Sequence, residues 1–474
     1  MTRPTVDVLI VIELPARELE TACLIRHYLE RRHGLTVRIA CPRGHSHGLL
    51  ARLCPRVICL PQFRLTAKAA IGYWWDGVPV VNLAWEQILS EVNLQANVPK
   101  DDFARREVHH TAWGRAYADH LMRHGVPADK VHVVGSPNFG LLEEPFRFLC
   151  RDRATLAREY QLDSSKTWLF FPENYGWAFL TDQDLMTRVR EGYYTREHAL
   201  AYRDFQQRNL RKMADWLRAV APSGTQIILR PRPITPPERF AEVFDGHVPP
   251  HVSIIKDGTA REWVLASDAV VSNYSTVLVD AAVAGKPACN LRTETFPDFL
   301  HAEFLDCAPS INSPDELREL CQDPESFRTR SYPLREYGLI NFHTPGNPFE
   351  RLAGLIATLR RQATSPPKYL HGRGWYRWDR SRRRWIPPWL RRTASLALRG
   401  TRLPEWPAGE INLDAPVLTA DQSLIERAKE LLTRIERHLD LITVERDSSR
   451  SSLDDTPPSA EYERPVPQSV RCRK

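Results

Sequence analysis

The sequence predicts an α/β protein with two doubly wound domains that face each other across a cleft. Short apolar runs alternate with segments of helical spacing in residues 1–150, and the alternation returns in residues 151–365. The apolar runs are nearly continuous, which is typical of parallel strands buried on both faces. Residues 266–290 combine an apolar run, a polar turn and a small-residue helix, the repeating unit of such a domain.

The expected strands divide equally between the two domains. The first domain has strands at 6–13, 36–41, 57–60, 78–84 and 131–134, and the second at 167–172, 226–230, 252–256, 269–271 and 288–291. Helices are expected at 17–32, 198–220 and 277–284. The Gly-x-Gly-x-x-Gly signature is absent, so the sequence does not support a nicotinamide cofactor.

The turn after 269–271 predicts a phosphate site. Ser275 and Thr276 precede an apolar helical run, as an N-cap does, and a helix N-terminus favours an anion. Asp280 lies about one turn into that helix, where its carboxylate could accept ribose hydroxyls. The alternative is an ordinary capped helix with no ligand.

Two arginines follow the predicted strand 226–230. Arg230 and Arg232 alternate with prolines, which hold the backbone extended and stiff. Arginine matches phosphate oxygens well, so both are candidates for phosphate binding. The alternative is a basic surface turn.

Glu86 follows the predicted strand 78–84 and is the candidate general base. The neighbouring Trp85 supplies an apolar wall, which raises the pKa of a carboxyl group and suits it to accept a proton. A surface or ion-paired glutamate is the alternative. His109 and His110 are expected to be solvated loop residues.

The order of these motifs resembles a known group of enzymes. Trp85-Glu86-Gln87, VHVVGSP at 131–137, FPENY at 171–175, LRPRP at 229–233 and SNYST at 272–276 with Gly285-Lys286-Pro287 follow in sequence. This order is similar to bacterial surface-polysaccharide biosynthesis proteins of the GT-B glycosyltransferase type. It is more distantly similar to teichoic-acid glycerophosphotransferases and to GT-B sialyl- and Kdo-transferases, which use CDP- or CMP-activated donors.

The resemblance implies roles for individual residues. Ser275 and Thr276 would bind the donor phosphate, and Asp280 would lie near the ribose. Trp85, Gln87, Asn174 and Tyr175 would line the cleft. The family usually has His-Pro where this chain has Arg232-Pro233, and the glycerophosphotransferases have His at the position of Glu86. Arg232 can hold a charge, but a catalytic role at that position is in doubt.

The C-terminal part changes composition. Residues 366–400 interleave Arg and Trp, and within them 368–399 is predicted to contact an anionic membrane surface. The alternatives are packing on the second domain or, less favoured, binding of single-stranded nucleic acid. Residues 401–446 form a linker and an amphipathic helix (420–446) that packs on the body or pairs with a second copy. Disorder is expected over 447–474.

The bulk properties narrow the functional class. The net charge of +7 does not by itself indicate nucleic acid, and the nine cysteines show no zinc-binding spacing. No run approaches the roughly 20 apolar residues of a membrane span, and no signal peptide is recognised. A cytoplasmic protein at the inner membrane face is expected.

The predicted function is a glycosyltransferase that uses a nucleotide-activated sugar, CMP- or CDP-linked among others, and a surface-glycan or lipid-linked acceptor. Its products would belong to a capsule or cell envelope. No cofactor is predicted, and metal-independent catalysis is expected because GT-B enzymes often act without a metal. The alternatives are a polyol-phosphate (glycerophosphate-type) transferase, a nucleotide-sugar epimerase and a non-catalytic GT-B-like scaffold.

Overall fold

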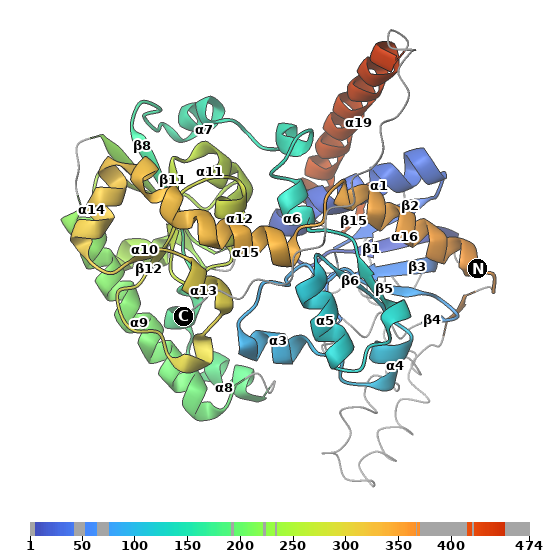
Figure 1. Cartoon of the computed structure of the whole chain (residues 1–474), viewed down its shortest axis with the longest axis horizontal. Helices are drawn as coiled ribbons and strands as arrows, with labels where there is room; N and C mark the ends of the chain where they lie inside the picture. Colours follow the sequence, from blue (N-terminus) through green and yellow to red (C-terminus); the bar gives the residue numbers. More distant parts are fainter. Residues whose placement is uncertain are drawn as a thin grey trace. The chain divides into compact units, whose positions relative to one another are not determined.

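The computed structural model describes most of the chain (Figure 1). The described residues are 5–41, 53–63, 75–190, 194–220, 224–232, 235–365, 367–369, 415–419 and 421–450. Residues 451–474 of the predicted disordered tail and almost all of the predicted membrane-contact segment lie outside these residues. Residues 447–450, where disorder was expected, belong instead to a described helix, Gln422–Arg450.

The described residues form two compact units, each discontinuous in sequence. The first unit draws on Met1–Trp85, Val98–Gly135 and Pro345–Arg464, and the second on Glu86–Asn97 and Ser136–Thr344. The predicted boundaries at 150 and 365 differ from this division, because the chain returns to the first unit after residue 344.

The first unit contains a seven-stranded parallel sheet in the order β15-β2-β1-β3-β5-β6-β7. Its strands are β1 (Thr5–Val11), β2 (Val37–Ala40), β3 (Cys54–Leu60), β5 (Val80–Asn82), β6 (His109–Ala112), β7 (Val131–Val133) and β15 (Val417–Leu418). A separate antiparallel pair joins β4 (Trp75–Asp76) to β14 (Lys368–Tyr369). The helices of this unit are α1 (Pro15–His33), α4 (Asp102–Arg106), α5 (Arg115–Arg123), α16 (Pro348–Gln362) and α19 (Gln422–Arg450).

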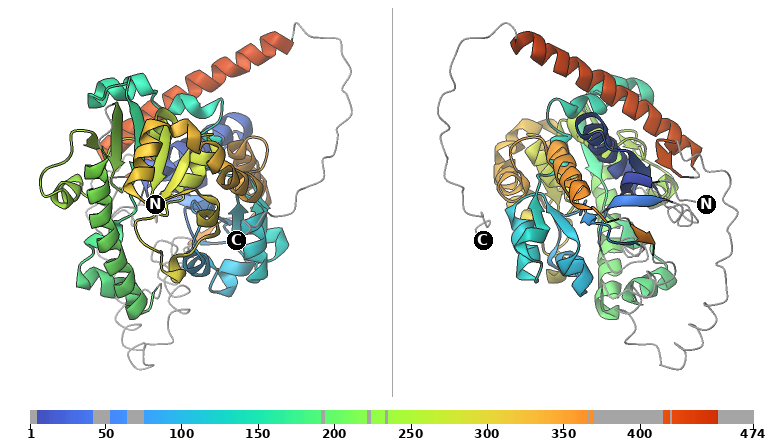
Figure 2. Two further views of the ribbon diagram at one scale, coloured as in Figure 1. Left: turned by 60° about the vertical axis from the view of Figure 1, so that its left-hand side comes forward. Right: turned by 90° about the vertical axis from the view of Figure 1, so that its right-hand side faces the viewer.

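Two late helices complete the first unit by packing on α1. Helix α16 contacts α1, β1 and β3, and the Asn347 side chain at its start donates to the Tyr28 hydroxyl at 2.7 Å. Helix α19 lies beside α1 (Figure 2) and buries an apolar stripe that includes Leu424, Ala428 and Ile435. The amphipathic helix therefore packs on the body, which was one of the two predicted alternatives.

The second unit contains a six-stranded parallel sheet in the order β10-β9-β8-β11-β12-β13. Its strands are β8 (Thr167–Pro172), β9 (Thr225–Arg230), β10 (Val252–Ile254), β11 (Ala269–Ser272), β12 (Ala288–Leu291) and β13 (Ser310–Ile311). Its helices are α3 (Glu91–Asn97), α6 (Pro137–Gly140), α7 (Arg153–Tyr160), α8 (Asp182–Arg190), α9 (Arg196–Ala219), α10 (Pro237–Val243), α11 (Ala260–Ala266), α12 (Val277–Val283), α13 (Glu303–Cys307), α14 (Pro314–Gln322) and α15 (Tyr332–Phe342).

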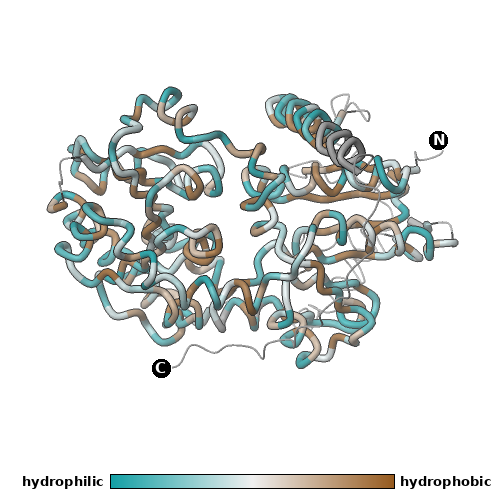
Figure 3. The backbone as a smooth tube through the Cα atoms, turned by 45° about the horizontal axis from the view of Figure 1, so that its top comes forward, coloured by the Kyte–Doolittle hydropathy of each residue, from teal (hydrophilic) through white to brown (hydrophobic). Residues whose placement is uncertain are grey.

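The strands carry the apolar core of each unit, as the hydropathy colouring shows (Figure 3). In the second unit, Leu169, Phe171, Ile227, Leu229 and Val271 are fully buried and belong to one cluster. The predicted fold class, two doubly wound α/β domains, is confirmed. Among the helices that the structure describes, none has both the length and the apolar composition to cross a bilayer.

We expect Ile435→Ala in α19 to destabilise the first unit by about 2–4 kcal/mol, because Ile435 is fully buried against the body. The loss is measured as the change in the free energy of unfolding in urea, with unfolding monitored by hydrogen exchange of peptides from α1. The exposed Glu436→Ala variant is the matched control. Equal stability of the two variants would contradict the packing of α19 on α1.

Candidate functional site

The candidate site in the second unit lies where the strand order of its sheet reverses. From β8 the chain moves to β9 on one side, and β11 pairs on the other side. Ligands of such sheets bind outside the carboxyl ends of the strands at this switch point. The loops that flank it are 173–176, after β8, and 273–276, after β11.

Glu173 joins two of the loops at this edge. Its carboxylate accepts a hydrogen bond from the Tyr175 backbone at 2.5 Å and another from the Arg232 backbone at 2.6 Å. The side chain is only 4% exposed. Burial raises the pKa of Glu173, and the two N–H donors oppose this rise. Sequence reasoning did not single out Glu173, although its place directly after a buried strand was the available signal.

Side-chain amides fix the loop after β11. Asn273 Oδ1 accepts a hydrogen bond from the Asn174 backbone at 3.0 Å, and Asn290 Oδ1 accepts one from the Tyr274 backbone at 3.0 Å. Tyr274 has a φ of +37°, in the left-handed region that a tyrosine rarely adopts. Its phenol hydrogen-bonds Tyr202 and Gln206 inside an aromatic cluster, which holds this conformation.

Arg232 is the predicted cation that faces outward at this edge. Its side chain is exposed, and its guanidinium donates to Asn174 Oδ1 at 2.9 Å. Asn174, which accepts from this guanidinium, donates its backbone N–H to Asn273 Oδ1 at 3.0 Å, and Asn273 directly precedes the loop residues Tyr274 and Ser275. Ser275 is partly exposed and Thr276 exposed. The fold therefore brings Asn174, Arg232 and the 274–276 loop together.

Arg230 is not grouped with Arg232 and Asn174, and the burial of its side chain does not favour its predicted role in phosphate binding. Its side chain is 8% exposed, and its guanidinium donates to the Gly258 carbonyl at 2.6 Å. The side chain is turned into the unit, where its buried Nε has no hydrogen-bond partner among the described residues. Arg230 and Arg232 have the same local sequence context but different environments.

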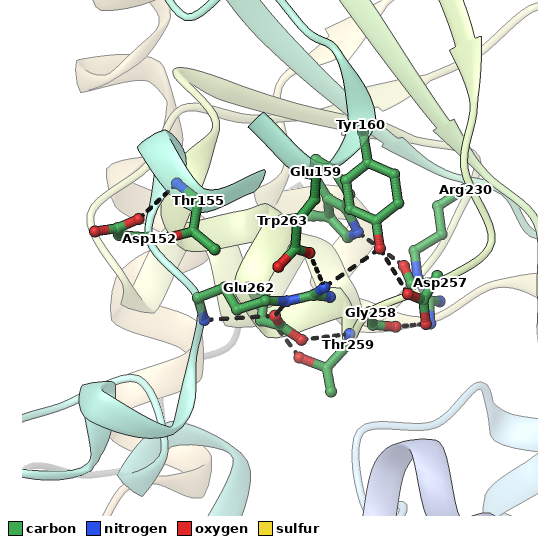
Figure 4. A network of polar contacts seen from close by, with 11 residues as sticks. Asp152, Thr155, Glu159, Tyr160, Arg230, Asp257, Gly258, Thr259, Glu262 and Trp263 are labelled. Carbon is green, nitrogen blue, oxygen red and sulfur yellow. Dashed lines mark hydrogen bonds and ion pairs between the residues drawn. The ribbon is translucent and has the colours of Figure 1, made fainter. Parts of the chain in front are cut away.

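Gly258 belongs to a structural network between α7 and α11 (Figure 4). Arg151 Nε donates to the Glu262 carboxylate at 2.5 Å, and Thr259 and Glu262 form a capping box at the start of α11. The Tyr160 hydroxyl donates to Asp257 at 2.6 Å. All of these donors have protein acceptors, so the network stabilises the fold and leaves little to bind a ligand.

The start of α12 differs from the predicted N-cap. Thr276 has helical backbone angles and its side chain makes no cap hydrogen bond, while Ser275 Oγ accepts from the Val277 backbone at 3.4 Å. The Thr276 hydroxyl therefore remains exposed at the end of the loop. Helix α12 has seven residues, so the predicted phosphate site would depend on side chains more than on the helix itself.

Three residues predicted to line a cleft are buried. Tyr175 is fully buried in the core of the second sheet, and Trp85 and Gln87 are 5% and 1% exposed. The prediction placed these side chains along a cleft, and their burial leaves them little surface to offer a ligand. Asn174 is the remaining residue of that set and is partly exposed.

Glu86 follows β5 in the chain, and its side chain is partly exposed. The turn before it is held from within the first unit. Asn82 Oδ1 accepts from the Ala84 backbone at 3.2 Å, and Ala84 has a φ of +43°. His110 Nδ1 accepts from Asn82 Nδ2 at 3.1 Å, while His110 Nε2 donates to the Ala104 carbonyl at 2.7 Å.

The histidines at 109 and 110 were expected to be solvated in a loop, and this prediction is wrong. Both lie in strand β6, and His110 is fully buried. Burial lowers the pKa of His110 to about 4, which keeps it neutral in the hydrogen-bond chain to Asn82. The sequence does not reveal this strand, because its side chains are polar and are buried only through hydrogen bonds to partners elsewhere in the chain.

A second carboxylate lies at the switch point of the first sheet, between β1 and β3. Glu13 follows β1, and its backbone donates to the buried Glu18 carboxylate at 2.6 Å. Glu18 in turn pairs with Arg17 at 2.8 Å. The sequence analysis did not consider Glu13 as a base, although Glu13 also follows a buried apolar strand. Glu13 is therefore the alternative to Glu86 as the candidate base.

Comparison with known proteins gives the fold. No protein-family model and no curated protein matches the sequence. Among solved structures, the wall teichoic acid polymerase TagF aligns with a TM-score of 0.50 and 10% identity, over 76% of this chain and 90% of that one. The UDP-GlcNAc 2-epimerase from Neisseria meningitidis bound to UDP-GlcNAc aligns at 0.44 and 11%, over 75% and 100%.

The chain has a GT-B-type fold. The resemblance drawn from the sequence motifs is thereby confirmed at the level of the fold. Within the GT-B-type units as described, no group of three or more His, Cys, Asp or Glu side chains is placed to hold a metal ion.

Asp280 has an unusual ionisation for a carboxyl group. Its side chain keeps partial exposure, but protein surrounds the carboxyl, and this burial raises the pKa of Asp280 to about 7, against a weak opposing effect of Arg261. The carboxyl therefore changes its charge near neutral pH. Ribose hydroxyls would bind best to the ionised form, which accepts hydrogen bonds only.

We expect Asp280→Asn to stabilise the second unit at pH 8 by about 1–3 kcal/mol and to have little effect near pH 4. The folded chain keeps the Asp280 proton up to a pKa of about 7, whereas the unfolded chain loses it near 4, so wild-type stability falls between these values. Urea unfolding at several pH values measures the difference. The exposed Asp298→Asn is the control, and a pH-independent effect of Asp280→Asn would contradict the burial of the carboxyl.

Proposed function

We propose that this chain is a glycosyltransferase of GT-B type that moves a sugar from a nucleotide-activated donor to a surface-glycan acceptor. The observation that carries the proposal is the grouping of Arg232 and Asn174 with the 274–276 loop at the switch point of the second sheet. An exposed guanidinium and exposed hydroxyls at this place suit the phosphates of a nucleotide.

The proposed chemistry divides charge stabilisation and proton transfer between different side chains. As the bond between the sugar and the phosphate breaks, negative charge grows on the leaving phosphate, and Arg232 and Thr276 stabilise it there. Glu86 accepts the proton of the attacking acceptor hydroxyl. Asp280 in its ionised form accepts the ribose hydroxyls. The reaction balances without a cofactor or a metal ion.

A polyol-phosphate transfer is the second candidate, because TagF has the GT-B-type fold and is a wall teichoic acid polymerase. In that reaction the acceptor attacks phosphorus, and Arg232 would again stabilise the phosphate oxygens. CDP- and CMP-linked donors are therefore the first to test. We propose that the transfer reaction takes place in the cytoplasm at the inner membrane face, with residues 368–399 as the membrane contact.

We expect one nucleotide among CMP, CDP, UDP and GDP to bind, and Arg232→Ala to weaken its binding at least about tenfold. A ligand at about 100 times its Kd stabilises a protein by roughly 2.7 kcal/mol, so a thermal-shift screen detects it. Arg239→Ala, an exposed arginine on α10, is the matched control. If no nucleotide stabilises the protein, the scaffold alternative replaces the proposal.

With the donor that binds and a lipid-linked glycan as acceptor, we expect Glu86→Gln to slow release of the free nucleotide by about 10²–10⁴-fold. The Kd of the nucleotide should stay unchanged, because the carboxylate acts on the acceptor. Glu13→Gln is the matched control. Loss of turnover in Glu13→Gln alone would assign the base to Glu13, and interconversion of the donor sugar without acceptor would indicate an epimerase.

A further inference from the structure

A pocket of about 530 Å³ lies in the first unit and shares no residue with the proposed nucleotide site. His109 from the first position of β6, Lys130 from the turn before β7 and His132 from β7 form one side. Gly354 and Thr358 from α16 form the other. Because β6 and β7 are parallel and these residues lie near their amino ends, the pocket is at the sheet edge opposite to the one that Glu86 follows.

A chain of hydrogen bonds runs through the pocket wall. Lys130 Nζ lies 3.4 Å from His109 Nε2, and His109 Nδ1 lies 3.0 Å from His132 Nε2. An ammonium group can only donate, so His109 accepts at Nε2 and donates from Nδ1 to His132. His132 then carries its own proton on Nδ1. In the described part of the chain, that donor has no protein acceptor.

The pocket lining is rich in hydrogen-bond donors and carries one positive side chain, Lys130, and one negative side chain, Asp129. Burial lowers the pKa of His109 to about 4 and lowers the pKa of His132, and the charge of Lys130 adds to both effects. Lys130 forms no ion pair with any carboxylate in the described residues, although the exposed Asp129 is its chain neighbour. The Lys130 ammonium and the unused N–H of His132 both line the pocket, and both are donors that suit an oxyanion.

The opposite wall suits hydroxyl groups. The Thr358 hydroxyl donates to the Gly354 carbonyl at 2.9 Å and accepts from the Arg361 guanidinium at 3.0 Å, which leaves one lone pair of its oxygen as an acceptor. Gln362 offers both an amide donor and a carbonyl. The volume is that of a small-molecule site and exceeds what one phosphate ion fills. We propose that this pocket binds a small phosphate ester of a sugar or polyol, with the phosphate on Lys130 and His132 and the hydroxyls on α16.

Gly354 allows the pocket to be filled without disturbing the fold. A Cβ placed on Gly354 meets nothing within 4 Å, and the residue lies inside helix α16, where glycine is the weaker helix former. Gly354→Phe would therefore place a ring in the pocket. Gly354→Ala adds one methyl group and keeps the pocket open, so it is the matched control.

The test is isothermal titration of the full chain with glycerol 3-phosphate, glucose 6-phosphate, inorganic phosphate, sulfate and glycerol. We expect one phosphate ester to bind with one site per chain, glycerol not to bind, and Gly354→Phe to abolish the binding. Lys130→Met and His132→Phe should each raise Kd at least about tenfold. Gly354→Ala and the exposed His247→Gln should leave it unchanged.

Several results would overturn the proposal. They are the absence of ester binding up to about 10 mM, tighter binding of sulfate or free phosphate than of any ester, and unchanged binding in Gly354→Phe. Arg232→Ala separates this pocket from the proposed nucleotide site. Loss of ester binding in Arg232→Ala with retention in Gly354→Phe would place the ester at the nucleotide site, and the pocket proposal would be wrong while the proposed function stood.

Discussion

The site of the second unit depends on one buried carboxylate. Glu173 accepts hydrogen bonds from the backbones of two neighbouring loops and, together with the Arg232–Asn174 contact, ties the loop after β9 to the loop after β8. The burial is costly for a carboxylate, as the direction of its pKa shift indicates. The two N–H donors would otherwise be unsatisfied at a sheet edge, and their hydrogen bonds to Glu173 offset the cost of burying its carboxylate. Arg232 points outward because its own backbone is held there.

Residues close in sequence have different roles: one is structural and its neighbour faces a proposed ligand site. Arg230 is buried and donates to the Gly258 carbonyl, and Arg232 is exposed beside Asn174. The same separation occurs in β6, where His110 faces Asn82 and His109 faces the pocket below α16. In β6 the alternation of side chains between the two faces of the sheet decides the role, whereas Arg230 ends β9 and Arg232 lies in the loop after it.

Strands, helices and the switch-point turn of the second unit could be predicted from the sequence, because apolar runs and N-cap residues are local signals. The burial of Arg230 could not be predicted, because its guanidinium binds the carbonyl of Gly258, 28 positions away. Strand β6 was missed because His110 and Thr111 are polar and are buried only through partners supplied by Asn82 and Ala104. The burial of Tyr175 could not be predicted either, because a tyrosine directly after a strand can lie in a core as well as at a surface.

The return of the chain to its first unit has a consequence for biosynthesis. Arg31 pairs with Asp440, 409 positions later, and β15 adds the last strand beside β2. On the ribosome, residues 136–344 of the second unit are complete before any of α16 emerges. The first unit therefore cannot be completed until α16, β15 and α19 have been made, and the face of α1 that α16 and α19 cover stays open until then.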